Sequence, residues 1–203
     1  MLRFALDLVA PRSCAACGVI SPAPLCAPCR SRLPPLAPLR RVDGAFVLGS
    51  RVYAPPLDAI VQRLKYGDRP DLAGALAELM APAIVGLQGT LVPVPLHPRR
   101  LADRGFNQSA LLCQALSRHI GAPVGVDWLV RTLDGAHQAQ SLSAQERALN
   151  VQGAFRARRA LKGEVVLVDD VVTTGATARS CIAALRAAGA QVVAVAAPCQ
   201  VPT

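Results

Sequence analysis

The sequence predicts an α/β protein with a parallel-sheet core and a small four-cysteine module near its N-terminus. The first observation is a set of short, unbroken aliphatic runs, such as residues 165–168, which are typical of strands buried on both faces of a parallel sheet. The second is the alternation of these runs with segments of helical spacing, the pattern of a parallel α/β fold. The third is a pair of Cys-x-x-Cys motifs within residues 14–29.

Chain length and composition indicate how large the hydrophobic core can be and which classes of molecule the protein could bind. A chain of 203 residues is long enough for one proper core and a small appendage. Hydrophobic residues make up 52% and aromatic residues only 3%, so the core must consist largely of Ala, Val and Leu. The net charge of +9 favours an anionic partner: a phosphorylated metabolite, a nucleic acid or an acidic membrane surface. The scarcity of aromatic residues argues against a stacking platform for single-stranded nucleic acid.

The first ten residues contain a short apolar run that Asp7 interrupts. A secretory signal peptide needs a longer apolar stretch, so we interpret this segment as a short amphipathic helix that packs on the main domain. No stretch approaches the ~20 apolar residues that a membrane-spanning helix needs. The expected location of the protein is the cytoplasm.

Four of the seven cysteines, Cys14, Cys17, Cys26 and Cys29, form two Cys-x-x-Cys motifs. Each motif can hold one side of a tetrahedral metal site, and Gly18 lets the first turn close. The interval between the motifs is shorter than the usual one of roughly 15–20 residues. It can still reach up to ~26 Å when extended, so both motifs can face one ion. We predict a structural Zn²⁺ site; redox dithiols and disulfides are the alternatives, and the cytosol disfavours stable disulfides.

Residues 32–41 contain three prolines and indicate a linker. The predicted organisation is therefore an N-terminal helix, zinc module and linker in residues 1–40, followed by a larger α/β domain in residues 41–203.

The remaining elements follow from hydrophobic periodicity and from the positions of glycine and proline. Two prolines within residues 90–95 predict that this strand lies at a sheet edge or ends there. Isolated cysteines within apolar segments are predicted to be buried: Cys113, Cys181 and Cys199. The predicted strands are residues 44–53, 90–95, 128–131, 151–155 (followed by a basic turn at 156–159), 165–168 and 191–197. The predicted helices are residues 55–65, 71–85, a segment ending at 120, a segment starting at 143, and 178–188.

The most informative stretch is residues 164–177, where a buried strand runs into Asp169 and Asp170 and then into a hydroxyl-rich turn. Open α/β sheets bind ligands at the carboxyl ends of their strands. A turn with a flexible glycine and hydroxyls at the start of a helix is a phosphate cradle. The adjacent carboxylates suit a neighbouring diol or a divalent cation; an Asp pair that only caps the next helix is the alternative. The residues of the predicted cradle are Val172, Thr173, Thr174, Gly175, Ala176 and Thr177.

A group of cations follows the strand at residues 90–95: His97, Arg99, Arg100 and Arg104. Positive charges gathered at the carboxyl end of a strand are costly unless an anion binds there, so we predict an anion site. A solvated basic turn is the alternative. Lys65, at the end of a predicted helix, is either a further phosphate contact or a solvated lysine that is favourable to the helix dipole.

The hydrophobic-Asp-Asp-x-x-Thr-Thr-Gly-x-Thr pattern of residues 164–177 resembles the motif with which type I phosphoribosyltransferases bind 5-phosphoribosyl-1-pyrophosphate. The resemblance implies that Asp169 and Asp170 hold the ribose hydroxyls and that the cradle wraps the 5′-phosphate. It also implies that Mg²⁺ accompanies the pyrophosphate, which the arginines after the earlier strand would bind. The candidate catalytic residues are Asp169, Asp170 and Arg104.

Several motifs in fixed order narrow the resemblance. They are the paired cysteine motifs, Val-Pro-Val-Pro-Leu-His-Pro-Arg-Arg, Arg-Gly-Phe-Asn-Gln and the Asp-Asp motif. Together they resemble the ComF family, which is associated with competence and DNA uptake. The resemblance covers residues 14–199 and implies a type I phosphoribosyltransferase core with an N-terminal double zinc ribbon.

Residues 132–143 predict a polar loop, and Ser143 with Glu146 forms a capping box that starts a helix. The region resembles the flexible loop that closes over the substrate in the family. Two glutamines flank the position that the family uses, so either one is the contact, and a surface role is the alternative for both. The candidate contacts of this region are Gln138, Gln140 and Arg147.

Three functions are consistent with these features. The first is a Mg²⁺-dependent phosphoribosyltransferase with an unknown acceptor, and the second is a non-catalytic sensor of phosphoribosyl pyrophosphate or a nucleotide. The third is a DNA-uptake factor whose zinc module and arginine-rich face engage single-stranded DNA or a competence helicase. Thr173 stands where purine-salvage members of the fold carry a carboxylate, which disfavours a purine acceptor.

Overall fold

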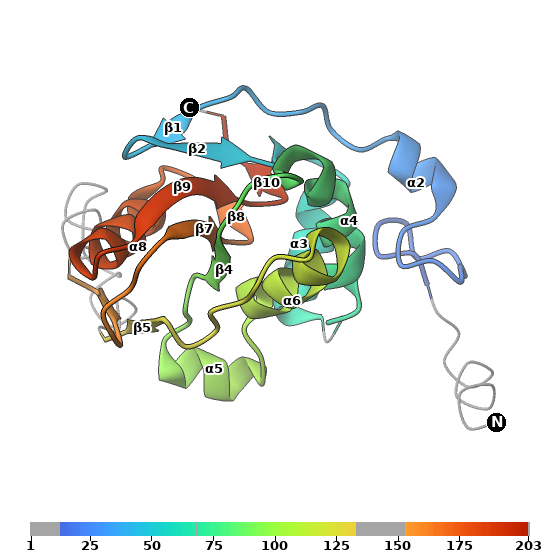
Figure 1. Cartoon of the computed structure of the whole chain (residues 1–203). Coiled ribbons are helices and arrows are strands. Elements are labelled where there is room, and N and C mark those ends of the chain that lie inside the picture. The colour runs from blue at the N-terminus through green and yellow to red at the C-terminus, as the bar shows by residue number, and fades with distance from the viewer. Residues whose placement is uncertain (1–12, 68, 133–152, 203) are drawn as a thin grey trace.

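The computed structural model describes residues 13–67, 69–132 and 153–202, and this part of the chain forms an α/β core with a small N-terminal module beside it (Figure 1). Its main sheet has five strands in the order β1-β2-β9-β7-β4. The β2–β9, β9–β7 and β7–β4 pairs are parallel, and β1 pairs with β2 in antiparallel fashion. The bounds are β1 Arg41–Val42, β2 Ala45–Leu48, β4 Thr90–Pro93, β7 Glu164–Val168 and β9 Gln191–Ala196. The predicted fold class is confirmed.

The inner strand β7, which lies between β9 and β4, is buried on both faces, as its aliphatic run predicts. Val166 and Val168 pack into one hydrophobic core, whereas Val165 and Leu167 pack into the other. Successive side chains of a strand point to opposite faces, so an unbroken run of valine and leucine supplies both cores at once. The proline-bearing β4 is the last strand on its side of the sheet, because proline cannot donate a ladder hydrogen bond.

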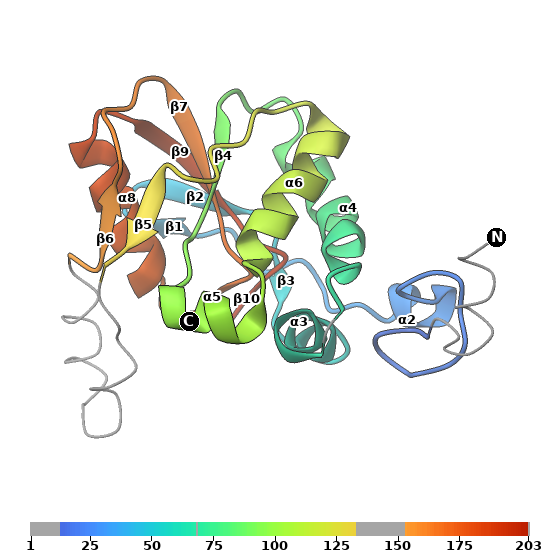
Figure 2. The ribbon, with the colours of Figure 1, turned by 90° about the horizontal axis from the view of Figure 1, so that it is seen from below.

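Helices cover the two faces of the sheet unequally (Figures 1 and 2). On one face lie α3 Leu57–Tyr66, α4 Leu72–Ile84 and α6 Gln108–Ile120, whose buried leucines share a core with Val166 and Val168. On the other face lies α8 Ala176–Ala187, which buries Cys181, Ile182 and Leu185. The short helix α5 Pro98–Arg104 follows β4 at its carboxyl end.

Two smaller sheets complete the described part. The parallel strands β3 Arg51–Val52, β10 Cys199–Gln200 and β8 Val171–Val172 form one, in the order β3-β10-β8. The antiparallel pair β5 Leu129–Arg131 and β6 Phe155–Ala157 forms the other.

Two predicted strands have other bounds in the structure. The strand expected over 44–53 is divided into β2 and β3, because the chain turns at Gly49, which has φ +74° and where a β-carbon would lie 3.2 Å from Met80 Cβ. Of the strand expected at 151–155, residues 151 and 152 lie outside the described residues, and the described strand β6 is Phe155–Ala157, which extends into the predicted basic turn because it pairs with β5. The basic segment after β4 forms the short helix α5, which is not predicted from the sequence.

The burial predicted for the isolated cysteines is confirmed, and the proline-rich segment is packed on the core. Cys113, Cys181 and Cys199 are fully buried. The proline-rich segment after the cysteines lies along the small sheet: the N–H of Val52 donates to the carbonyl of Pro35 (3.0 Å), and Gln200 Nε2 donates to that of Pro38 (2.8 Å). No helix in the described ranges has the length and apolar character that crossing a membrane requires. The N-terminal helix and the helix starting at 143 lie outside the described residues.

Candidate functional site

The two acids that follow β7 lie in contrasting surroundings. Asp170 is only 4% exposed, and its Oδ1 forms an ion pair with Lys65 Nζ at 2.9 Å. Its other oxygen, Oδ2, is buried and has no hydrogen-bond partner among the described residues. Asp169 is partly buried, and its Oδ1 accepts hydrogen bonds from the backbone N–H of Asp170 (2.8 Å) and from Ser109 Oγ (3.4 Å). The acid pair therefore retains acceptor capacity that the surrounding protein does not use.

The pKa values in this cluster reflect burial and mutual charge. Burial and, next, the charge of Asp170 raise the pKa of Asp169 from 3.8 to about 7. Burial alone would lower the pKa of Lys65, but the neighbouring Asp170 carboxylate outweighs it and the pKa is raised. Lys65 is thus a cation paired with the carboxylate of Asp170. A ligand that stabilises the negative charge of Asp169 would favour the ionised form of this carboxyl.

The turn after the acids begins the helix α8. Gly175 is the N-cap of this helix, with φ +78°, and a β-carbon there would lie 2.9 Å from Val42 Cγ2. Both the conformation and the close approach therefore require glycine. The first N–H groups of a helix have no partner within it and attract anions. The N–H of Ala176 makes a long bond (3.4 Å) to Thr174 Oγ1. Thr173 and Thr174 are exposed, whereas the side chain of Val172 is buried in the core, so only its backbone is accessible to a ligand.

A pocket of about 440 Å³ adjoins the acid pair. Lys65 connects the two, because it lines the pocket and also pairs with Asp170. Arg104 stacks over the ring of Tyr66 at 4.8 Å and donates a hydrogen bond to Gln108 Oε1, which fixes its guanidinium at the pocket wall. The lining residues are Lys65, Tyr66, Arg100, Asp103 and Arg104. With three cations and one acid, the pocket suits an anionic group.

The structure brings together some of the predicted contacts but not all of them. Arg99 is exposed in the first turn of α5 and does not line the pocket that holds Arg100 and Arg104. His97 caps α5, with Nδ1 accepting from the N–H of Arg99 at 3.3 Å. The predicted loop contacts lie outside the described residues: Gln138, Gln140 and Arg147.

Sequence reasoning missed four residues of this site. Ser109 is fully buried, and its hydroxyl donates to Asp169. The only sequence feature that could have indicated this role is its position just after Asn107, the residue that caps α6. Gln108 holds Arg104. Two further arginines contact the backbone of the turn, and no sequence pattern indicates them: Arg40 and Arg179.

The four N-terminal cysteines come together as predicted. Cys26 and Cys29 lie at the start of and within α2, Ala27–Ser31, and Cys14 and Cys17 lie in the preceding turn. Their sulfur atoms all lie within 4.8 Å of one another, and Cys17 and Cys26 Sγ are 3.8 Å apart. A tetrahedral zinc ion with Zn–S bonds of about 2.3 Å requires S–S separations of about 3.8 Å. The cluster therefore fits such an ion.

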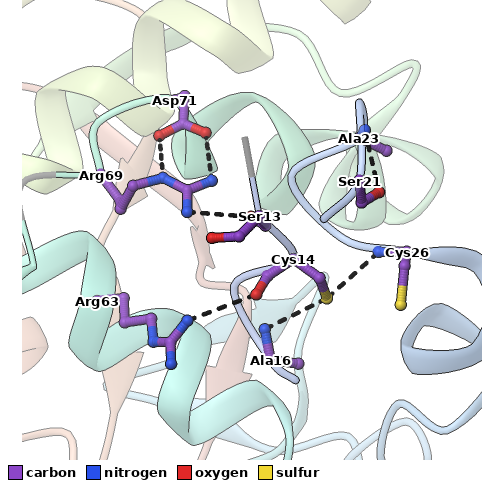
Figure 3. Close-up of polar contacts among 9 residues, drawn as sticks. All are labelled: Ser13, Cys14, Ala16, Ser21, Ala23, Cys26, Arg63, Arg69 and Asp71. Atoms are coloured by element: carbon purple, nitrogen blue, oxygen red, sulfur yellow. Dashed lines mark hydrogen bonds and ion pairs between the residues drawn. The ribbon is translucent and has the colours of Figure 1, made fainter. Parts of the chain in front are cut away.

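Backbone N–H groups favour a thiolate at Cys14. Its Sγ accepts from the N–H of Ala16 and from that of Cys26, each at 3.4 Å (Figure 3). Burial would raise the pKa of Cys14, but backbone hydrogen bonds outweigh it and lower the pKa to about 6. The hydrogen bond with Cys26, together with burial, raises the pKa of Cys29 to about 12. Cysteine binds a metal ion as a thiolate, and the lowered pKa of Cys14 favours this form before any metal binds.

The cysteine module is attached to the helices of the α/β core. Figure 3 shows Arg63, from α3, donating to the carbonyl of Cys14 (3.5 Å) and Arg69 donating to that of Ser13 (3.1 Å). Asp71 holds Arg69 through two bonds of 2.8 Å. Ala15 is fully buried in the same hydrophobic core as α3 and α4. The module is therefore fixed against the face of the core that also carries Lys65.

The sheet is mostly parallel, and its inner strand β7 is followed by two adjacent acids and a glycine-capped helix, beside a cationic pocket. These features define a phosphoribosyltransferase-type α/β domain. The family model described as the phosphoribosyl transferase domain matches residues 107–203.

Within this class, the chain belongs to the ComF family. DNA utilization protein YhgH of Salmonella typhimurium strain LT2 is 39% identical over 175 residues, which cover 81% of this chain and 73% of that protein. Competence protein F of Haemophilus influenzae is 32% identical over 166 residues, covering 75% and 71%. The protein named YhgH in Escherichia coli strain K12 is 43% identical over 134 residues, and the match spans 59% of its length and 62% of this chain.

The matches to solved structures are more distant. The glutamine phosphoribosylpyrophosphate amidotransferase of B. subtilis is 24% identical, with a TM-score of 0.41, and the match covers 64% of this chain and 25% of that one. The adenine phosphoribosyltransferase of Leishmania donovani is 16% identical, with a TM-score of 0.41 and coverage of 79% and 73%.

Proposed function

We propose that the protein binds 5-phosphoribosyl-1-pyrophosphate with Mg²⁺ and transfers the phosphoribosyl group to an acceptor. The observation that carries the proposal is the buried Asp170, whose Oδ2 has no hydrogen-bond partner among the described residues. It lies beside Asp169, shortly before the start of α8, and its partner Lys65 lines the cationic pocket. A sugar with two hydroxyl donors, flanked by a phosphate and a diphosphate, matches these three features together.

The chain's residues have distinct roles in this proposal. The carboxylates of Asp169 and Asp170 accept hydrogen bonds from the ribose hydroxyls, and Ser109 orients Asp169. The first amides of α8 bind the 5′-phosphate. Lys65, Arg100 and Arg104 bind the diphosphate in the adjoining pocket. Gln138, Gln140 and Arg147 stay predictions from the sequence.

Transfer breaks the bond between the anomeric carbon and the pyrophosphate oxygen, and the bonding electron pair leaves with pyrophosphate. The acceptor then forms the new bond to that carbon. The pocket arginines and Lys65 stabilise the charge that develops on the leaving group. Mg²⁺ supplies further neutralisation of the diphosphate when it is bound. The protein thus promotes departure of pyrophosphate through the positive charge of this pocket, and not through a basic side chain in the turn.

We propose a structural role for zinc at the cysteine cluster, with Cys14, Cys17, Cys26 and Cys29 as its four ligands. All-cysteine sites are closed and stabilise a fold, whereas catalytic zinc sites keep one open position. The fit of the sulfur separations and the attachment of the module to α3 support this role.

A non-catalytic sensor of the same sugar diphosphate is the second candidate. The exposed Thr173, in place of a carboxylate, favours it because the turn then offers no base for proton transfer with an acceptor. Two relatives are named for DNA utilization and for competence, so we propose that either function serves one of these processes. A single-stranded DNA or helicase partner stays a prediction that rests on the zinc module, the arginine-rich face and the family's association with DNA uptake.

Pyrophosphate release separates the two candidates. The zinc-loaded protein is incubated with phosphoribosyl pyrophosphate, Mg²⁺ and a panel of amine and pyrimidine-like acceptors. Release that rises with one acceptor, falls at least about tenfold in Arg104→Met and is unchanged in Arg99→Met supports the transferase. Arg99 is the matched control because it lies on the same helix but outside the pocket. Calorimetric binding without release favours the sensor, and absence of binding contradicts both.

A further inference from the structure

Two arginines contact the outer side of the turn that follows the acid pair. Arg40 Nη2 donates hydrogen bonds to the carbonyl of Val172, at 3.1 Å, and to that of Thr173. Arg179 Nη1 donates to the carbonyl of Thr174, also at 3.1 Å. Three consecutive carbonyls are therefore bonded to guanidinium groups.

The planarity of the peptide unit turns these bonds into a constraint on the amides. In a trans peptide, the C=O of one residue and the N–H of the next point in opposite directions. Fixing the carbonyls of Val172, Thr173 and Thr174 therefore directs the N–H groups of Thr173, Thr174 and Gly175 to the other side of the turn. Successive N–H groups that face one side form an anion-binding concavity.

The electrostatics also indicate an anion at this place. Burial and then the charge of Arg179 lower the pKa of Arg40. Arg40 Nε is buried without a hydrogen-bond partner among the described residues. A helix N-terminus carries partial positive charge, so cations beside the start of α8 are unfavourable. Two arginines next to each other at that end of the helix become favourable when an anion binds on the opposite side of the turn, where its charge offsets theirs.

Arg40 reaches the turn from the segment that follows the cysteine module. The N–H of Val47 in β2 donates to the carbonyl of Arg40 at 2.9 Å. Pro35 and Pro38 accept hydrogen bonds from Val52 and Gln200. The segment is thus held along β2, β3 and β10, and its proline content limits the conformations open to it. Arg40 is placed by a rigid backbone rather than by a free linker.

We propose that Arg40 is a positioning residue for anion binding at residues 173–177: it orients the amides of the turn through their preceding carbonyls. The inference rests on the proposed function in that the anion is the 5′-phosphate of the phosphoribosyl ligand. It adds a role for the segment between the cysteine module and β2, since this segment completes the phosphate site from behind.

Calorimetric titration of the zinc-loaded full chain with phosphoribosyl pyrophosphate and Mg²⁺ tests the proposal. Arg40→Ala is expected to weaken binding by about tenfold or more, because two charge-assisted hydrogen bonds to the turn are lost. Arg41→Ala is the matched control. It removes the same charge one residue away, where the side chain stacks on Phe46 and contacts the carbonyl of Gly44. The control is expected to stay within about twofold of wild type, as surface charges at a distance are screened.

Arg40→Lys distinguishes positioning from charge alone. Lysine keeps the charge but lacks the planar fork, so its affinity is expected to fall between wild type and Arg40→Ala. Equal losses in Arg40→Ala and Arg41→Ala overturn the proposal, and so does full wild-type affinity in Arg40→Lys.

Hydrogen exchange in the ligand-free protein separates this inference from the proposed function. Faster exchange at the amides of residues 173–175 in Arg40→Ala than in Arg41→Ala, with unchanged protection in β7, supports the positioning role. Equal exchange in the two variants overturns it. If wild type does not bind the sugar diphosphate at all, the proposed function fails, and the exchange comparison still decides the role of Arg40.

Discussion

The cysteine cluster and the acid-pair site are built in opposite ways. The four cysteines lie within residues 14–29, and their spacing alone places four sulfur atoms within 4.8 Å of one another. The acid-pair site instead joins β7 to α3 through Lys65, to α6 through Ser109 and to the segment before β1 through Arg40. When all residues of a site lie in one short segment, the sequence can predict every one of them. When the fold brings residues together from distant segments, the sequence predicts only those that lie within one continuous motif.

The largest expected effect concerns the local site. Cys29→Ser or zinc chelation removes one ligand or the ion, and structural zinc contributes on the order of 10 kcal/mol to folding in small zinc modules. We expect loss of one equivalent of bound zinc and rapid proteolysis within residues 13–33, measured by metal analysis and limited digestion. Arg32→Ala, which is exposed and outside the cluster, should change neither. Retained zinc in Cys29→Ser would contradict the four-ligand assignment.

The next effect concerns the assembled site. Lys65→Met leaves Asp170 buried without its cation, and breaking a buried ion pair from one side costs about 3–5 kcal/mol. We expect a comparable drop in the free energy of unfolding, measured in urea. Adding Asp170→Asn should recover much of the loss, because the uncompensated charge is then gone. A Lys65→Met protein as stable as wild type would show that the pair contributes little to the fold.

The smallest effect, taken per pH unit, is a pH dependence of stability. The raised pKa of Asp169, about 7 against 3.8, means that the folded state binds more protons than the unfolded state between these values. Stability should therefore fall as pH rises from about 4 to 7 and level off above, with a slope of at most about 1.4 kcal/mol per pH unit. Asp169→Asn should remove that part of the slope. An identical pH profile in the variant would contradict the raised pKa.

The same contrast explains what the sequence predicts of this protein. The aliphatic run of β7 predicts a doubly buried strand because period and composition act locally, and the acids at its end follow from the chain itself. Arg100 and Arg104 are found because they gather after one strand. Ser109 and Arg40 are missed, because their roles arise only when α6 and the proline-rich segment pack beside residues some 60 and 130 positions away. Similarly, the sequence allows Lys65 to be either a phosphate contact or a solvated lysine. The ion pair with Asp170, which shows that it is not simply solvated, is a tertiary contact that the sequence does not predict.

The account rests on one claim: Asp169, Asp170 and the turn before α8 form a single site for a phosphorylated sugar. The most direct measurement is the calorimetric affinity of the zinc-loaded protein for phosphoribosyl pyrophosphate with Mg²⁺, compared with that of the Asp169→Asn, Asp170→Asn double variant. Asp127→Asn, an exposed acid away from the pair, is the control. The account predicts saturable binding by wild type and control and a loss of at least about 100-fold in the double variant, since two charge-assisted hydrogen bonds disappear. Equal affinities of the three proteins would contradict it.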